Sequence, residues 1–129
     1  MFEILFYEDK SGYSELFEEL QQLDGKAKKN KNSRILYNQI VFCIELLSQY
    51  GTRIPSNVTK HIQGNIWELR PGKNRILYFY FSDNKYVFLH MFVKKTQKTP
   101  KKEIEKAIKE MNDFLERQKG DQNENLGRL

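Results

Sequence analysis

Three short segments rich in β-branched and aromatic residues follow one another along the chain, and they constrain the fold more than any other feature. They cover residues 66–70, 75–81 and 86–93, and four residues separate each segment from the next. The separators contain Pro71-Gly72 and Asp83-Asn84, which are typical of tight turns. Because short turns join antiparallel neighbours, this stretch predicts a three-stranded antiparallel sheet.

The middle segment is apolar on both of its faces. Leu77 and Phe79 alternate with Ile76, Tyr78 and Tyr80. A sheet with one face in water would show polar residues at every second position. We therefore expect a covering layer on each face, and the last helix or a partner protein can supply the second one.

Helical and strand periodicities complete the predicted fold. We expect a first strand, two helices that form an antiparallel hairpin, the three strands, and a last helix. The predicted order is β-α-α-β-β-β-α in a single compact α+β domain with a mainly antiparallel sheet. The predicted ranges are 2–7 for the first strand, 14–23, 33–50 and 99–118 for the helices, 52–64 for an irregular link, 1–118 for the domain and 119–129 for a polar C-terminal tail.

Capping residues mark the predicted helix ends. Ser14 and Thr99 are expected N-caps, and Pro100 is expected at the first helical position. Gly25 is expected to interrupt the first helix and Gly51 to stop the second.

Composition narrows the classes of function. The 129 residues include 22 Lys and Arg against 17 Asp and Glu, a net charge of +5 that favours a nucleic acid or an acidic protein as partner. The single cysteine, Cys43, lies in an apolar helical pattern and is expected to be a buried small hydrophobe. We expect neither a signal peptide nor a membrane span, because the N-terminus lacks a basic segment and no apolar run reaches about 20 residues.

Several chemistries are excluded by their missing motifs. Two histidines and one cysteine, far apart, form no zinc pattern. There is no glycine-rich phosphate loop and no G-x-S-x-G elbow. Paired-carboxylate hydrolysis lacks a second acid near Glu68.

Cations at strand ends remain the strongest candidate site. Glu68 and Arg70 point the same way from their strand, and Arg75 begins the next strand. Lys94 and Lys95 end the last strand. A planar, permanently charged guanidinium suits a phosphate, so this cluster predicts a site for a phosphodiester and points toward RNA.

Each candidate also has a purely structural interpretation. Glu68 could pair with an arginine as scaffold or act as a base, and His90, inside an apolar strand, is more often a core histidine. His61 could reach substrate from a loop. The cationic connector of residues 26–31 is either a solubilising turn or a ribosome or RNA contact. Only an exposed subset of the aromatic residues could stack on bases.

These residues carry a resemblance to a known family. The runs Trp67-Glu68-Leu69-Arg70, Arg75-Ile-Leu-Tyr-Phe and Phe92-Val93-Lys94-Lys95-Thr96-Gln97-Lys98-Thr99-Pro100 resemble the HigB-type branch of the RelE superfamily of toxins, most closely over residues 60–107. The resemblance implies a compact RelE-like fold and ribosome-dependent cleavage of mRNA, in which the RNA's own 2′-hydroxyl attacks without metal or cofactor.

The resemblance also implies roles for individual residues. Arg75 would stabilise transition-state charge, Lys94 and Lys95 would contact phosphate or transfer a proton, and Arg70 is the next candidate. At Glu68 some relatives carry a catalytic lysine, so the general base is left open between a lysine, Glu68 and His90. The expected RNA-binding residues are Lys98, Lys73, His61 and Lys101.

The implied partners follow from the same resemblance. They are a HigA-like helix-turn-helix antitoxin in a toxin–antitoxin hetero-oligomer, mRNA on the ribosome, and operator DNA only indirectly through the antitoxin. The implied location is the bacterial cytoplasm, with no membrane contact. The alternatives are a non-catalytic RNA- or ribosome-binding module and an inactive relative that acts as co-repressor with its antitoxin.

Overall fold

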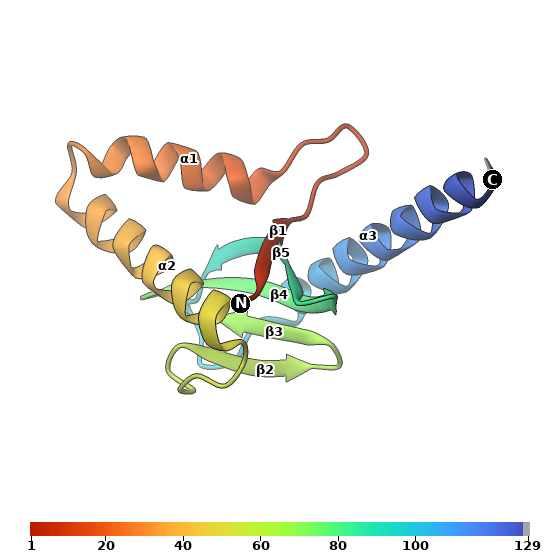
Figure 1. The fold of residues 1–129 in the computed structure, drawn as a ribbon. Coiled ribbons are helices and arrows are strands. Elements are labelled where there is room, and N and C mark those ends of the chain that lie inside the picture. Colours follow the sequence, from red (N-terminus) through yellow and green to blue (C-terminus); the bar gives the residue numbers. More distant parts are fainter. Residues whose placement is uncertain (128–129) are drawn as a thin grey trace.

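A five-stranded sheet forms the middle layer of the protein, with helices on both faces (Figure 1). The computed structural model describes the backbone of residues 1–127 and the side chains of residues 1–120, so the last two residues of the predicted tail lie outside the described residues. This arrangement confirms the predicted α+β class. The elements are β1 (Glu3–Phe6), α1 (Glu15–Ala27), α2 (Lys31–Tyr50), β2 (Thr59–Gln63), β3 (Ile66–Leu69), β4 (Asn74–Ser82), β5 (Lys85–Val93) and α3 (Lys101–Gly127).

The sheet is mixed and has the strand order β1-β5-β4-β3-β2. Strands β2 to β5 are antiparallel neighbours in sequence order, which confirms the predicted antiparallel sheet. Strand β1 pairs in parallel with β5 and places Glu3 opposite Lys85. The first strand therefore lies at one edge of the sheet, beside the last one.

Two apolar cores form on the two faces of the sheet. The α1–α2 hairpin buries Leu16, Cys43 and Leu47 on one face, as expected for Cys43. Helix α3 packs Ala107 against the Leu77 side of the sheet on the other face. The last helix is thus the second covering layer that the apolar pattern of β4 requires.

Strand β2 was not predicted from the sequence, where residues 52–64 were expected to be irregular. It pairs antiparallel with β3 and places Lys60 opposite Glu68. The Thr59 hydroxyl is buried and donates to the Glu68 carbonyl oxygen at 2.8 Å. The overlooked signal is Gly64-Asn65, a typical two-residue hairpin turn, with Gly64 at φ 55°.

The helices are longer than predicted. Helix α1 continues through Gly25 to Ala27, because a glycine inside a helix costs only about 1 kcal/mol and Ala27 is buried. Helix α2 begins at Lys31, where the Asn30 side chain accepts a hydrogen bond from the Ser33 N–H at 3.0 Å. Helix α3 continues to Gly127, past its predicted end at residue 118. The division into a domain and a tail at residue 118 stays a prediction.

The helix ends agree with prediction for α1 and α2 and differ from it at the start of α3. Ser14 caps α1, since its Oγ accepts a hydrogen bond from the Phe17 N–H at 3.1 Å, and Gly51 ends α2. Thr99 as an N-cap is wrong, because α3 begins at Lys101 and Thr99 lies two residues before it; the Thr99 hydroxyl donates to Glu68 Oε1 at 2.6 Å. The Pro100 carbonyl accepts from the N–H groups of Glu103 and Ile104 at 3.0 and 3.2 Å, so Pro100 holds the N-cap position and not the predicted first helical position.

Within residues 1–127, no helix combines the length and the apolar composition that crossing a membrane requires.

Candidate functional site

The predicted cations gather on the α3 face of the sheet, where β3 ends and β4 begins. Glu68 pairs across the strands with Leu77, which belongs to the α3-side core. Side chains alternate along a strand, so Arg70, two residues after Glu68, and Arg75, two residues before Leu77, share this face. Lys94 follows β5 directly. The register that the sequence left open therefore brings Arg70 and Arg75 together.

Glu68 is the centre of this cluster and is completely buried. Its Oε2 lies 3.4 Å from the Nε of Arg70 and 3.7 Å from the Nε of Arg75. Its Oε1 accepts the hydrogen bond from Thr99. Among the described residues, no group donates a hydrogen bond to Oε2, so charge alone holds this oxygen. The carboxylate is thus bracketed by two guanidinium groups and one hydroxyl.

Backbone carbonyls fix both arginines. Arg75 Nη1 donates to the carbonyl oxygens of Gly72 at 2.8 Å and Asn74 at 2.7 Å. Arg70 Nη1 donates to the Ser56 carbonyl at 2.9 Å. Burial lowers the pKa of Arg75, and the Glu68 carboxylate works in the opposite direction. Both guanidinium groups are therefore held in place before any ligand arrives.

Gly72 makes the turn that carries the carbonyl partner of Arg75. Its φ is 57°, a left-handed conformation that glycine adopts without strain. The side chain of Gln39, from α2, packs directly on it, since its Oε1 would lie 2.5 Å from an added Cβ. The middle of α2 is thus in contact with the edge of the site.

Lys94 lines a cavity of about 250 Å³ whose wall also includes Glu68 and Thr99. Burial lowers the pKa of Lys94, and the cations Arg75 and Arg70 lower it further, whereas Glu68 opposes them. A lysine in such surroundings releases its proton more readily than a free one. The cavity also contains Lys60, His61 and Lys98.

The remaining predicted lysines do not join this cluster. Lys95 is exposed and lines a separate cavity of about 440 Å³ beside Phe92. Lys101 is exposed at the start of α3 and pairs with Glu105 at 3.9 Å. Lys73 lies exposed in the turn before β4, where its carbonyl accepts from the Lys94 N–H at 2.8 Å.

The two histidines have different surroundings. His90 is buried, with Nδ1 2.6 Å from Glu110 Oε1 and Nε2 3.1 Å from Glu103 Oε1. Both acids belong to α3, so His90 ties β5 to that helix, in agreement with its interpretation as a core histidine. His61 lies on β2 rather than in a loop, is exposed, and packs edge-on against the Trp67 ring.

Sequence reasoning missed two residues of the site. Lys60 is not predicted, because strand β2, which places it beside Glu68, is not predicted from the sequence. The Gly64-Asn65 turn that follows β2 is the sequence feature that could have revealed it. Thr99 was assigned to the helix cap, and nothing in its local sequence distinguishes a cap from a partner of a buried carboxylate.

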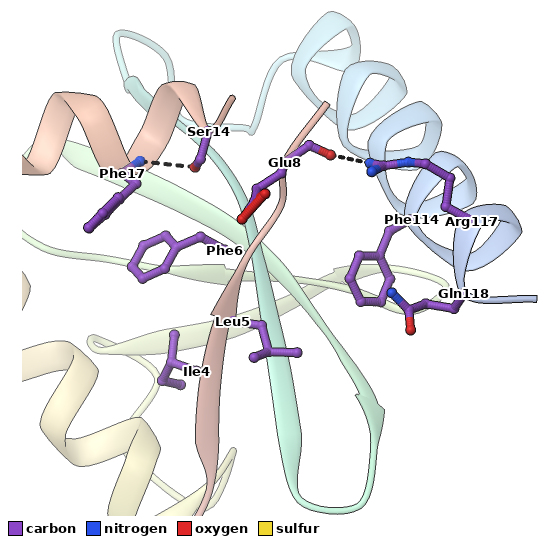
Figure 2. A pocket seen from close by; sticks show the side chains of 9 residues that line it. All are labelled: Ile4, Leu5, Phe6, Glu8, Ser14, Phe17, Phe114, Arg117 and Gln118. Atoms are coloured by element: carbon purple, nitrogen blue, oxygen red, sulfur yellow. Dashed lines mark hydrogen bonds between the residues drawn. The ribbon is translucent and has the colours of Figure 1, made fainter. Parts of the chain in front are cut away.

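A larger cavity lies elsewhere and has a different character. It measures about 550 Å³ between β1, the start of α1 and the C-terminal half of α3, and Figure 2 shows Phe6, Phe17 and Phe114 around it. Its one cation, Arg117, is engaged by Asp113 at 2.9 Å and by the Glu8 carbonyl. This cavity therefore offers no free charge for a phosphate.

The arrangement around Glu68 suits an anion with several oxygens. Preorganised guanidinium groups bind and stabilise phosphate charge because they are fixed before the ligand arrives. Among the described residues, no group of three or more histidine, cysteine, aspartate or glutamate side chains is placed to hold a metal ion.

A family model and two solved structures resemble this chain. The sequence model of the family described as "Phage derived protein Gp49-like (DUF891)" matches residues 18–112. A chain of the heterotetrameric YoeB-YefM toxin–antitoxin complex from Staphylococcus aureus is similar in fold, with a TM-score of 0.50 and 13% identity over 74% of this chain and 98% of that chain. A chain of another YoeB-YefM complex from Staphylococcus aureus gives a TM-score of 0.49 and 14% identity over 70% and 94% of the two chains. A search of curated proteins found no match.

Proposed function

The chain belongs to the phage-derived Gp49-like family, and on this premise we propose that it is the toxin of a type II toxin–antitoxin pair. The likeness of its fold to a chain of a toxin–antitoxin complex supports this role. Its proposed activity is that of a ribosome-dependent mRNA endonuclease in the bacterial cytoplasm, as the HigB-like runs of residues 67–100 suggest. A HigA-like helix-turn-helix antitoxin neutralises it in a hetero-oligomer.

The observation that carries the proposal is the buried carboxylate of Glu68 between Arg70 and Arg75, at 3.4 and 3.7 Å. Taking charges out of water costs several kcal/mol per ion in free energy. A bracket of two guanidinium groups around one acid leaves an excess of positive charge at the site. That excess favours a phosphodiester whose negative charge grows during reaction.

In the proposed reaction the 2′-hydroxyl of the RNA is the nucleophile, and the positive charge of Arg70 and Arg75 surrounds the phosphate. The 2′-oxygen attacks the adjacent phosphorus, the bond from phosphorus to the 5′-oxygen breaks, and a 2′,3′-cyclic phosphate and a 5′-hydroxyl form. One proton leaves the 2′-hydroxyl for a base, and one proton is delivered to the leaving 5′-oxygen. Arg75 stabilises the charge on the phosphoryl oxygens, and Arg70 assists it.

We assign proton transfer to Lys94 rather than Lys95. Burial and the neighbouring cations lower the pKa of Lys94, which brings it closer to the range in which a lysine can exchange protons. Lys95 is exposed and lies in another cavity, so its proposed role is an outer phosphate contact. Glu68 is assigned to positioning both arginines, because its side chain is fully buried.

The remaining cations are proposed to position the RNA. Lys98 and His61 line the Lys94 cavity and contact the backbone on either side of the cut. Lys73 and Lys101 are exposed farther out and contribute attraction without fixed geometry. Substituting an outer contact should weaken binding with a salt dependence, whereas substituting Arg75 should slow the reaction itself.

Primer extension on a translated message tests the proposal. The purified protein is compared with Arg75→Ala, with and without ribosomes, and binding to ribosomes is measured in parallel. Ribosome-dependent cuts that disappear in the variant while binding persists support the endonuclease. An uncut message at full occupancy refutes it and leaves the non-catalytic binding module or the co-repressor.

A further inference from the structure

We propose that the tip of the α1–α2 hairpin, residues 26–34, is a second RNA-binding surface that binds the phosphate backbone of folded RNA outside the cleavage site. This inference rests on the proposed ribosomal function. In Figure 1 the tip lies at the end of the hairpin that points away from the sheet.

The tip carries the whole net charge of the protein. It contains Lys26, Lys28, Lys29, Lys31 and Arg34 and no acidic residue. The other 17 lysines and arginines of the chain equal its 17 acidic residues, so the formal charge of +5 resides in these nine residues. A concentrated patch of this kind is the electrostatic footprint of a polyanion partner.

None of these charges is neutralised within the described side chains. All five cations are exposed, and no carboxylate among residues 1–120 lies within ion-pair distance of any of them. Lys31 also opens α2, where the helix dipole favours acids, and the first turn of α2 contains none. The five cations of the tip therefore repel one another, and a turn that served only for solubility could reduce this repulsion with one or two acidic residues.

The backbone of the tip is held by hydrogen bonds within the turn. The connection between the helices is only residues 28–30, and the Lys29 and Asn30 N–H groups donate to the Lys26 carbonyl at 3.1 and 2.9 Å. Arg34 Nε donates to the Ala27 carbonyl at 3.1 Å, across the turn. Ala27 itself is buried. The backbone that carries the cations is thus fixed before an RNA binds, so the entropy cost of binding falls mainly on the lysine side chains.

The chemistry of the tip favours RNA over a membrane or a protein. Residues 28–34 consist only of lysine, asparagine, serine and arginine. Membrane-surface helices need aromatic or large aliphatic side chains to enter the lipid, and protein interfaces need buried aromatic anchors. Lysine, arginine, asparagine and serine are instead the side chains that contact nucleic-acid phosphates.

The tip lies within reach of an RNA bound at the site. Gln39, eight residues after Lys31 on α2, packs on Gly72 in the turn that holds Arg75. At ~1.5 Å per residue, the tip is about 12 Å along α2 from this turn. The site lies on the α3 face of the sheet and the hairpin covers the other face, so one folded RNA contacts both surfaces by passing around the end of the sheet at this turn.

The test measures ribosome binding as a function of salt. The variant Lys28→Gln/Lys29→Gln/Lys31→Gln is compared with Lys10→Gln/Lys109→Gln/Lys119→Gln, which removes three exposed lysines elsewhere. Each lost phosphate contact should reduce the slope of log K against log salt by about 0.7–0.9, so the tip variant loses about 2–3 units of slope and about 100-fold in affinity near ~0.1 M salt. The control variant should stay close to the wild type.

A charge reversal separates binding from folding. Lys31→Glu should raise the midpoint of urea unfolding, because an acid suits the start of α2, and yet weaken ribosome binding. A tip variant that keeps the wild-type slope refutes the proposal, and so does one that loses binding to phosphatidylserine vesicles while ribosome binding is unchanged. Message cleavage by the wild type is scored separately, so a protein that binds through the tip but cuts nothing refutes only the proposed activity.

Discussion

Replacing Glu68 with glutamine is the most direct perturbation of the site. At 3.4 and 3.7 Å from the two arginines, the carboxylate gains ~5 and ~4 kcal/mol of Coulomb energy at an effective dielectric constant of ~20. The desolvation of three largely buried charges offsets much of this gain. Glu68→Gln keeps the shape but leaves two guanidinium groups facing a neutral amide.

The expected loss in the free energy of unfolding is about 3–5 kcal/mol, the usual cost of removing one partner of a buried pair. Urea denaturation measures it, with Glu105→Gln as the control, because Glu105 makes an exposed pair with Lys101. The control should lose less than about 1 kcal/mol. Adding Arg75→Gln to Glu68→Gln should cost less than Arg75→Gln alone, since the repulsion is partly relieved. A loss below about 1 kcal/mol for Glu68→Gln would refute the reasoning.

Three further predictions test residues around the Glu68 cluster: Lys94, His90 and Gly72. Message cleavage should rise with pH, reach half of its maximum at the lowered pKa of Lys94, below the ordinary 10.5, and level off above it, because the neutral amine is the base. Lys94→Arg should remove this rise, and an unchanged pH profile would contradict the assignment. His90→Leu should cost about 1–3 kcal/mol in urea unfolding, because it removes the hydrogen-bond partner of Glu103 and Glu110. Gly72→Ala should cost about 1–2 kcal/mol from its positive φ, and the loss should persist when Gln39 is also replaced by alanine.

The sequence was sufficient for the elements that have strong periodicity. The three antiparallel strands after residue 65 and both helices of the hairpin lie where their apolar patterns predicted them. The need for a second covering layer also followed from β4 alone, since its residues are apolar on both faces. These features depend on local pattern, which a single sequence contains.

The contacts that define the site depend on register and could not be predicted. Whether Arg70 and Arg75 meet at one carboxylate depends on which residues of β3 and β4 are opposite each other. Lys94 and Lys95 are equivalent in sequence, and only the direction of their side chains separates the Glu68 cavity from its neighbour. Thr99 fits equally well as a helix cap and as a carboxylate partner, and tertiary burial decides between them.

The parallel pairing of β1 with β5 has a consequence for the order of folding. The site residues lie between residues 60 and 99, a stretch of hairpins whose contacts are close in sequence and form early. Strand β1, by contrast, pairs with a strand about 80 residues later in the chain. Because the long intervening loop costs conformational entropy to close, this edge of the sheet forms later. During synthesis, the N-terminal strand and the helical hairpin thus leave the ribosome before the strand that completes their core exists. The nascent chain exposes the apolar side of that hairpin until residues 85–93 have emerged.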